Sequence, residues 1–265
     1  MKVINLNKFC KRILGLLVIL VVIIAVHNIS YAEPVVPRIN LEIGTSDNPK
    51  DVSSSIQVLL LITILSLAPS ILIMMTSFTR IIIVLSFLRN ALGTQQMPPN
   101  QVLIGLALFL SLFIMSPVLS EINTNAYQPY AKGEISQQEA LNSASKTIKT
   151  FMVKQIVNNK REKDLAFFIN LSEAELPESK EDLPDLPFNI VAPAFLISEL
   201  ATAFKIGFLI YLPFLIIDMV VSSTLMAMGM MMLPPVMISL PFKILIFVMV
   251  DGWNLVIQSL VKTFY

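Results

Sequence analysis

Side chains that commonly carry catalysis or bind metals are scarce in this sequence. Its single cysteine, Cys10, and its single histidine, His27, both lie in the first 32 residues. If that segment is removed, the mature chain cannot form a Cys/His zinc site, a thiol nucleophile or a Ser-His-Asp triad. Carboxylate chemistry remains, and Asp218 and Asp251 would be the pair available to an intramembrane hydrolase. These two aspartates match no catalytic motif, so we expect neither an enzyme nor a cofactor or metal site.

The composition indicates a membrane protein. Of 265 residues, 55% are hydrophobic and only 14% are charged, with a mean hydropathy of +0.75. A soluble domain carries roughly a quarter charged residues. The apolar residues gather in long runs, as membrane-associated helices require. The formal net charge of +1 provides no basic surface for nucleic acid, so no nucleic-acid partner is expected.

Residues 1–32 have the pattern of a cleaved signal peptide. An apolar core over 13–26 is short for a bilayer span of about 20 residues, and Ser30 and Ala32 offer small side chains before a cleavage site at Glu33. A retained signal anchor is the alternative. Cleavage would place the chain from Glu33 onward outside the cytoplasm. The positively charged start contains four basic residues: Lys2, Lys8, Lys11 and Arg12.

A polar lead-in and then an apolar region follow the signal peptide. Residues 33–55 are rich in proline and are predicted to be extended. Residues 56–119 contain only two charged side chains, Arg80 and Arg89, and are predicted to form an N-terminal apolar helical hairpin region. Within it we expect helices over 56–75, 81–88 and 102–119, with a break at 93–99.

Residues 120–187 differ sharply in composition from their neighbours. They hold eight Lys or Arg and eleven Asp or Glu, so we expect a small soluble domain on the extracytoplasmic side. Residues 136–168 favour a helix, with Ser136 and Glu139 spaced as a capping box. The acidic, proline-containing stretch 173–185 is predicted to be a linker.

Residues 188–265 are predicted to form a C-terminal apolar helical hairpin. We expect a long helix over 193–228, bent near Pro213, a turn over 229–235 and a returning helix over 236–260. The predicted fold class is therefore all-α: membrane-associated helical hairpins with a small extracytoplasmic helical domain.

Charged side chains interrupt these apolar helices, where an unpaired charge is costly. We hypothesise that Lys243 pairs with Asp218 or Glu199, within the chain or across a subunit boundary. Solvation at helix ends, above all for Asp251 and Lys262, and a proton relay are the alternatives. Arg80 and Arg89 flank a short apolar helix, where they either bond to Ser/Thr neighbours or anchor the helix at the membrane interface. The charges expected to be buried besides Glu199, Asp218 and Lys243 are Arg80, Arg89, Lys205 and Asp251.

A methionine cluster marks the predicted hairpin tip. Three consecutive methionines, Met230, Met231 and Met232, precede Leu233 and a proline pair. Methionine is flexible and polarizable, so a ring of such loops from several subunits would seal a pore yet deform around a passing chain. The alternative is an ordinary lipid-facing or core position for these side chains.

Two stretches of the sequence resemble the signature regions of the FliP/SctR family. They are 76–100 (TSFTRIIIVLSFLRNALGTQQMPPN) and 195–253, which includes FLISELATAFKIGF, LPFLIIDMVVSSTLMAMGMMMLPP and PFKILIFVMVDGW. The leader and the 120–187 insert are more similar to flagellar members than to injectisome members. Leu233 before the proline pair is a mild departure from the family pattern.

This resemblance implies a structural subunit of the flagellar type III protein-export gate, which forms a channel for unfolded flagellar proteins across the inner membrane. It implies a conical homo-pentamer with FliQ-type and FliR-type subunits, and FlhB-type and FlhA-type export components as further partners. In this reading Met230, Met231 and Met232 form the pore gasket, and Glu199, Asp218 and Lys243 form structural salt bridges. The expected location is the bacterial inner membrane and flagellar basal body, with 120–187 on the periplasmic side. An injectisome gate subunit and, less favoured, a small-solute transporter subunit are the alternatives.

Overall fold

The computed structural model describes residues 49–94, 96–172, 179, 182–230 and 233–265, and every regular element among them is helical. The all-α fold class is therefore confirmed over this part of the chain. The chain divides after Ile56, and the unit from Gln57 onward is described below. The expected signal peptide and residues 33–48 of the lead-in lie outside the described residues. Residues 49–55, which were expected to be extended, belong instead to a helix.

Within the described residues, three helices precede the charged segment: α2 (Pro49–Met74), α3 (Phe78–Leu92) and α4 (Asn100–Ile122). Helix α3 is longer at both ends than the predicted 81–88. It ends at Gly93, whose φ of 76° lets its N–H bond to the carbonyl of Asn90. The α2–α3 junction bends by 65°.

The charged segment forms short helices that continue from α4. A π-helical turn (Asn123–Tyr127) and α5 (Gln128–Ala131) lead to α6 (Gln137–Asn158), α7 (Glu162–Leu171) and a 3-10 turn (Leu183–Asp185). The predicted capping box is present, with Ser136 and Glu139 each bonding to the other's backbone N–H. The single helix expected over 136–168 is broken at Lys160, whose φ is 56°.

These helices share a core with the apolar ones. Met152 and Ile156 of α6 and Leu165 of α7 pack with Val191 and Phe195 of α8. Both faces of this contact are apolar, and burying each such side chain contributes roughly 1.5–3 kcal/mol.

The C-terminal region forms α8 (Phe188–Ala227), α9 (Pro235–Met249) and α10 (Gly252–Lys262). The returning helix, predicted to be continuous over 236–260, is bent by 66° between α9 and α10. The bend lies at Asp251, which has a φ of 49°. Gly252 allows it, because a Cβ there would lie 2.2 Å from Phe247 Cδ2.

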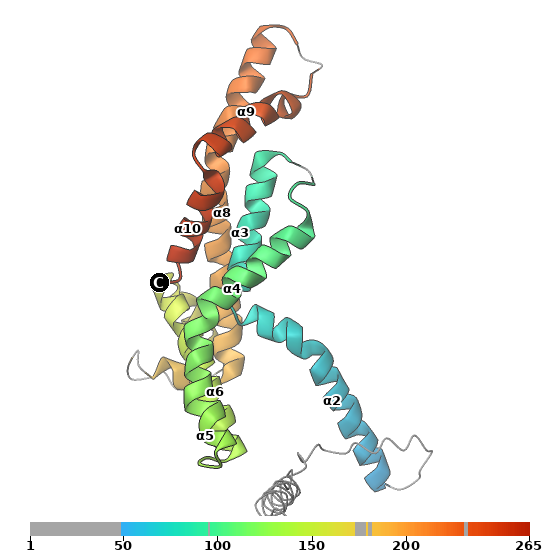
Figure 1. The fold of residues 1–265 in the computed structure, drawn as a ribbon, viewed down its shortest axis with the longest axis vertical. Coiled ribbons are helices and arrows are strands. Elements are labelled where there is room, and N and C mark those ends of the chain that lie inside the picture. Colours follow the sequence, from blue (N-terminus) through green and yellow to red (C-terminus); the bar gives the residue numbers. More distant parts are fainter. Residues whose placement is uncertain (1–48, 95, 173–178, 180–181, 231–232) are drawn as a thin grey trace, which may run out of the picture. The chain divides into compact units, whose positions relative to one another are not determined.

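Helix α8 is the central support of this unit. Its first turns pack on α6 and α7, its middle packs on α3, and its later turns contact α9 (Figure 1). Gly207 permits the close contact with α3, because a Cβ at this position would lie 2.5 Å from the Phe87 ring. A second core lies where Val84 of α3, Ala107 of α4 and Ala203 of α8 meet Leu260 of α10.

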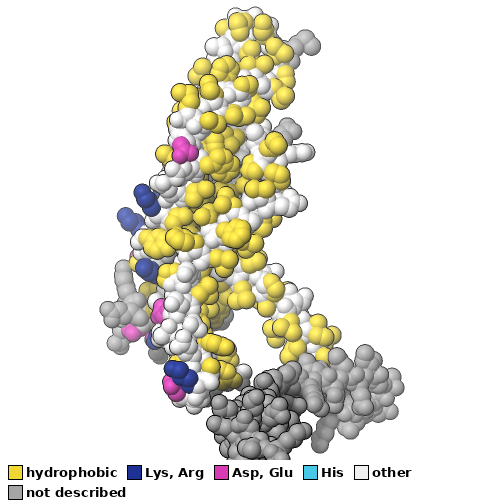
Figure 2. Space-filling view, in the orientation of Figure 1, with side chains coloured by type: hydrophobic (Ala, Val, Ile, Leu, Met, Phe, Trp, Pro, Cys, Tyr) yellow, Lys and Arg dark blue, Asp and Glu magenta, His cyan; other side chains and the backbone are white. Residues whose placement is uncertain are grey.

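Several helices have the length and hydropathy needed to cross a membrane. Among the described residues, two candidate spans, Asn100–Ala131 and Phe188–Ala227, qualify alone. The bent pairs α2–α3 and α9–α10 raise that total to four if each pair is one span. Large apolar side chains such as Phe109, Val248 and Met249 are exposed on the single chain. On the face of the molecule drawn in Figure 2, hydrophobic side chains cover most of the described surface, and charged side chains lie along one flank. This surface requires lipid or protein partners.

Candidate functional site

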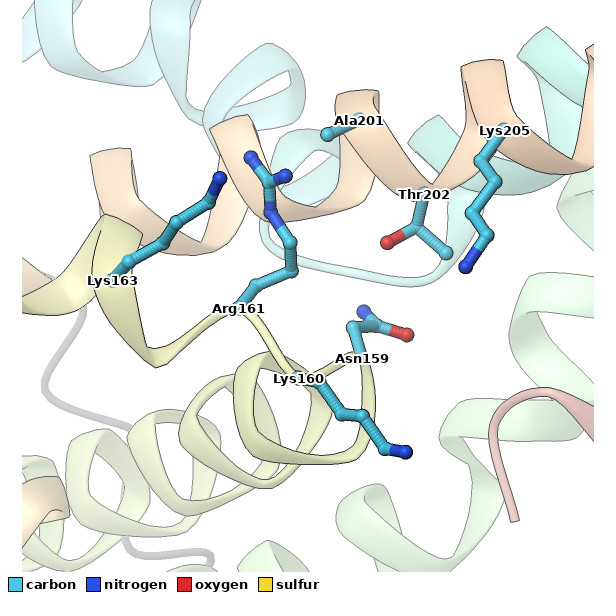
Figure 3. Close-up of a pocket in the computed structure, with 7 residues that line it drawn as sticks. All are labelled: Asn159, Lys160, Arg161, Lys163, Ala201, Thr202 and Lys205. Carbon is cyan, nitrogen blue, oxygen red and sulfur yellow. The ribbon is translucent and has the colours of Figure 1, made fainter.

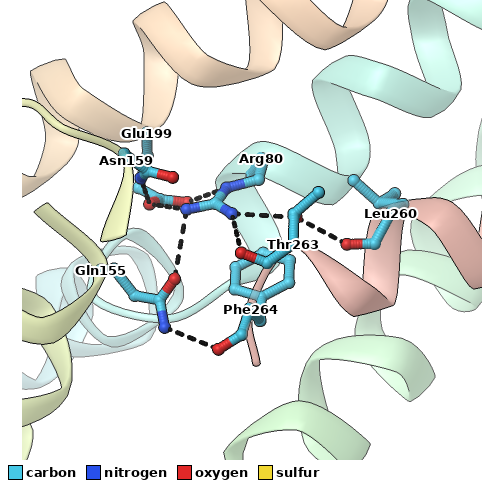
Figure 4. Close-up of polar contacts among 7 residues, drawn as sticks. All are labelled: Arg80, Gln155, Asn159, Glu199, Leu260, Thr263 and Phe264. Carbon is cyan, nitrogen blue, oxygen red and sulfur yellow. Dashed lines mark hydrogen bonds and ion pairs between the residues drawn. The ribbon is translucent and has the colours of Figure 1, made fainter. Parts of the chain in front are cut away.

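A buried ion pair joins α3 to α8. Arg80 and Glu199 are both inaccessible to solvent. The Arg80 Nε donates to Glu199 Oε2 at 2.8 Å, and the Arg80 Nη2 donates to Glu199 Oε1 (Figure 4). The guanidinium and the carboxylate thus bind through two parallel hydrogen bonds, the geometry that makes arginine the preferred partner in buried pairs.

Further contacts satisfy the remaining polar atoms of this pair. Arg80 Nη1 donates to the carbonyl and hydroxyl oxygens of Thr263, at 3.2 and 3.0 Å. Gln155 accepts from Arg80 Nη2 at 3.4 Å and donates to the Phe264 carbonyl at 3.1 Å. Asn159 donates to Glu199 Oε1 at 3.3 Å. The Arg80 Cζ lies 3.9 Å from the centre of the Phe264 ring, a cation–π contact. The network therefore ties together α3, α6, α8 and the residues after α10.

A second ion pair links the two helices of the C-terminal hairpin. The Lys243 Nζ of α9 lies 2.6 Å from Asp218 Oδ2 of α8. Lys243 is almost fully buried, whereas the Asp218 side chain is 26% exposed. The Lys243 ammonium also donates to the Ala91 carbonyl at 3.2 Å, and the Ser239 hydroxyl donates to Asp218 Oδ1. This pair therefore joins the end of α3 to the α8–α9 hairpin within one chain.

The structure brings together only part of the predicted charge set. Of the two partners considered for Lys243, it places Asp218 beside the lysine, while Glu199 contacts Arg80. Sequence reasoning did not connect Arg80 with Glu199, although each was identified as a charge inside an apolar helix. No local pattern links the two residues, because their contact depends on the packing of α3 against α8.

Three of the other charges expected to be buried behave differently. Lys205 and Asp251 are exposed on the single chain, so the expected burial of their charges would require other subunits. Asp251 accepts a hydrogen bond from Asn254 Nδ2 at 3.0 Å. Arg89 is half-buried and donates to Asn100 Oδ1, while its Nε is buried without a partner.

The methionine tip is only partly described. Met226, Met228 and Met230 are exposed, and Met231 and Met232 lie outside the described residues. Next to the tip, a mainly apolar cavity of about 480 Å³ lies between α8 and α9, lined by side chains that include Met219, Met226 and Val236. Exposed methionine side chains such as Met226, Met228 and Met230 suit contact with other chains more than chemistry on a small molecule.

The described residues hold no group of three His, Cys, Asp or Glu side chains placed to bind a metal ion. Asp218 and Asp251 have separate partners, Lys243 for the first and Asn254 for the second. The Asp218 contact thus joins α8 to α9, whereas the Asp251 contact lies within the first turn of α10.

These features define a helical protein with membrane-capable helices whose buried charges serve helix–helix contacts. Residues 61–260 match the model of the FliP family. The chain belongs to the FliP family. It is 59% identical over 224 residues to the flagellar biosynthetic protein FliP of Bacillus subtilis (strain 168), covering 84% of this chain and 98% of that protein. It is 54% identical to the protein of that name from Pectobacterium carotovorum subsp. carotovorum, covering 80% of this chain and 79% of the relative. With the one from Aquifex aeolicus (strain VF5) the identity is 48%, and the match covers 86% of this chain and 92% of the relative.

Proposed function

We propose that this chain is a structural subunit of the flagellar type III protein-export gate and that it has no enzymatic activity. In this role it contributes to the channel through which unfolded flagellar proteins cross the inner membrane. The observation that carries the proposal is the 59% identity to a protein named for flagellar biosynthesis, over 98% of that protein's length. The membrane-capable helices support a location in the inner membrane and basal body. The signal-peptide pattern of residues 1–32 supports a periplasmic position for residues 120–187.

We also propose that five copies assemble with FliQ-type and FliR-type subunits and act with FlhB-type and FlhA-type components. Exposed apolar side chains on α8 and α9, such as Phe208 and Val248, support extensive burial against other subunits or lipid. The two ion pairs then hold the hairpins in the form that assembles. Met230, Met231 and Met232 act as the gasket that closes the channel between export events.

Genetic replacement in Bacillus subtilis tests the export role. The chain, or a chimera carrying its residues 57–265 behind the host protein's own N-terminal segment, replaces the host flagellar biosynthetic protein FliP. Restored swimming and flagellin secretion are expected. Membrane-inserted protein at normal levels without flagellin export would contradict the proposal. Saturable uptake of a small solute by the chain reconstituted alone would favour the transporter alternative.

Native mass spectrometry of the complex in mild detergent tests the assembly. Five copies of a chain starting at Glu33, with smaller hydrophobic partners, are expected. The gasket is tested by replacing Met230, Met231 and Met232 with alanine, which should raise ion leakage across the membrane. Met97→Ala is the matched control, because Met97 is exposed far from the hairpin tip in the sequence.

A further inference from the structure

Helix α9 is attached to the rest of the chain along a single narrow stripe. Within α9, which the structure describes completely, three side chains are buried, and they recur every four residues on one face: Ser239, Lys243 and Phe247. Phe247, the apolar member, lies near the end of the helix, where its ring packs against Trp253 and Phe214. The remainder of α9 is therefore held by the two polar members of the stripe.

These two polar side chains bond to both neighbouring helices. The Lys243 Nζ donates to Asp218 Oδ2 of α8 at 2.6 Å and to the Ala91 carbonyl of α3 at 3.2 Å. The Ser239 hydroxyl donates to the other oxygen of the same carboxylate. Ala91 lies in the last turn of α3, where carbonyl groups lack partners within the helix. We call these contacts of Ser239 and Lys243 the latch, because they fix the position of α9.

Close apolar packing does not reinforce the latch. A mainly apolar cavity of about 480 Å³ lies between α8 and α9, and Asp218 is among its lining residues. Large side chains on the other faces of α9, such as Phe242 and Leu245, are exposed on the single chain. Near the end of α3, a Cβ at Gly93 would lie 3.4 Å from Leu240 Cδ1, an ordinary van der Waals distance. An element with so few buried apolar contacts opens at a low free-energy cost.

The backbone after α9 has the form of a joint. Asp251 takes the left-handed conformation, with φ 49° and ψ 53°, and α10 leaves it at 66° to α9. The Asp251 N–H bonds to the Val248 carbonyl, and the Asp251 carbonyl accepts from the Leu255 N–H, both at 3.1 Å. One residue therefore ends the hydrogen bonds of α9 and begins those of α10. Hinges are short segments of this kind, at the ends of elements, that absorb changes in φ and ψ.

The elements on the other side of the joint are fixed. Leu260 of α10 is buried in a core, and Thr263 just after α10 accepts hydrogen bonds from Arg80. The first half of α8 packs on α6 and α7, and around Thr202 it lies beside the α6–α7 turn that carries Arg161 (Figure 3). Asp251 thus separates a fixed base, made of α3, α6, α10 and the first half of α8, from a weakly held α9.

We propose that α9 is an arm that pivots about Asp251. In the closed position the latch is formed, and in the open position Lys243 has left the Ala91 carbonyl and Asp218. Asp218 is already 26% exposed, so the separated charges can be hydrated. Seven residues, 228–234, connect α8 to α9, which is long enough to follow a displacement of several Å.

The pivot would displace the hairpin tip that contains Met230, because α9 follows this tip directly in the chain. The pivot itself does not depend on the proposed export role. Its use in widening the channel for a passing chain does rest on that role.

Distances between spin labels test the pivot in the full chain, purified in mild detergent with its co-expressed partners. Copies that carry labels are diluted with unlabelled copies, and Cys10→Ser leaves no native cysteine. One label replaces the exposed Lys154 of α6. The second replaces Met237 or Leu245 of α9, or the exposed Ser259 of α10 as the fixed reference. Pulsed electron paramagnetic resonance gives the distance distribution of each pair.

The latch variant carries Ser239→Ala and Lys243→Met together. Losing hydrogen bonds to a charged group should raise the ratio of open to closed arms by on the order of 10-fold or more. A second distance should therefore appear or grow for both α9 labels, while the α10 reference distance stays the same. Lys132→Met is the matched control, because it removes one exposed lysine outside the latch and should leave the ratio unchanged.

A second variant, Asp251→Gly, keeps the latch but loosens the joint, because glycine accepts many more backbone conformations. It should broaden both α9 distances and leave the α10 reference unchanged. If the latch variant disturbs the α10 reference, the whole bundle has loosened and Asp251→Gly decides the question. Unchanged α9 distances in that variant overturn the pivot.

Two further results overturn the proposal. A single, unchanged distance for both α9 labels in a latch variant with an intact reference shows that α9 is fixed. A change at Met237 without one at Leu245 places the bend at Pro241, inside α9, and not at Asp251. These distances are measured without export, so failure of the pivot is distinct from failure of the export role, which the replacement in Bacillus subtilis tests.

Discussion

Arg80 and Glu199 lie 119 residues apart in the chain and form a fully buried ion pair between α3 and α8. Five further groups complete the surroundings of the pair: the Thr263 carbonyl and hydroxyl, the Gln155 amide, the Asn159 amide and the Phe264 ring. A pair enclosed in this way has no water available to replace a missing partner. Removing one member therefore leaves the other charged and buried.

Replacing one residue of this pair should destabilise the protein strongly. We expect Glu199→Ala or Arg80→Ala to lower the free energy of unfolding by roughly 3–5 kcal/mol. The double variant Arg80→Met with Glu199→Leu should cost clearly less than the two single changes added together, because no charge then stays unpaired. Denaturant unfolding in detergent measures the free-energy changes of the single variants and of the double variant. Additive effects would show that the two side chains do not interact.

Substitutions in the Lys243–Asp218 pair should lower the free energy of unfolding less than those in the Arg80–Glu199 pair, because Asp218 is partly exposed. We expect Lys243→Ala to cost roughly 1.5–3 kcal/mol, the range for losing hydrogen bonds to a charged group. Asp218→Asn should cost at least as much, because it keeps an acceptor for Ser239 but leaves the buried Lys243 ammonium without a negative partner. The exchanged pair Lys243→Asp with Asp218→Lys tests direct pairing by partial recovery of thermal stability. Failure of the exchange to exceed either single change would count against a direct contact.

Two glycine substitutions should have opposite effects on stability. Gly207→Ala places a methyl group 2.5 Å from the Phe87 ring, so α3 and α8 must separate slightly, at a cost of about 1–3 kcal/mol. Gly105→Ala in α4 is the matched control, because no atom lies within 4 Å of its Cβ position. This control should stabilise α4 by about 0.5–1 kcal/mol through the lower entropy of the unfolded chain. Thermal unfolding of the two variants side by side gives the result, and equal effects would refute the close α3–α8 contact.

The start of α6 should loosen in acid. The Ser136 backbone N–H donates to Glu139 at 2.8 Å and lowers the pKa of this carboxyl, with the Ser136 hydroxyl as the second cause. A pKa that is lower in the folded state means that the cap stabilises α6 above the unfolded-state pKa and is lost as the pH falls through the folded-state pKa. Hydrogen exchange of the first-turn amides should therefore become faster, relative to the rest of α6, in the range below the ordinary glutamate pKa of about 4.3.

Glu139→Gln is the control for this acid response. The amide cannot be titrated, so the relative exchange of the first turn should not change with acidification. Asp185 also has a lowered pKa, chiefly from a hydrogen bond with Lys146, and stays unchanged in this variant. A residual acid response equal to that of wild type would assign the effect to Asp185 or another group.

The sequence predicted the ends of helices well where residues typical of a helix start or a turn mark them. The spacing of Ser136 and Glu139 identified the start of α6, and the proline pair before Val236 identified the start of the returning helix. Two breaks were missed for physical reasons. At Asp251 an Asp-Gly turn signal was outweighed by apolar residues on both sides, and at Lys160 a lysine occupies a position where glycine is the usual signal.

The charge pairs were harder to predict because they depend on which helices become neighbours. Residue spacing showed that Glu199 and Lys205 lie on different faces of one helix, but it carries no information on distant partners. The Arg80–Glu199 contact follows from the packing of α3 on α8, which itself depends on small residues such as Gly207. Asp218 and Lys243 lie on consecutive helices of a hairpin, so their contact was within reach of the sequence.

The bonds from Arg80 to Thr263 span 183 residues and therefore set an order of events during synthesis. Arg80 emerges from the ribosome long before Glu199, and Glu199 well before Thr263 and Phe264. Until α8 is made, α3 carries an arginine without its acid, and placing it in an apolar environment costs several kcal/mol. We expect α3 to wait at the membrane surface or beside the translocation machinery until α8 arrives. The bundle closes only when Thr263 and Phe264 have been translated.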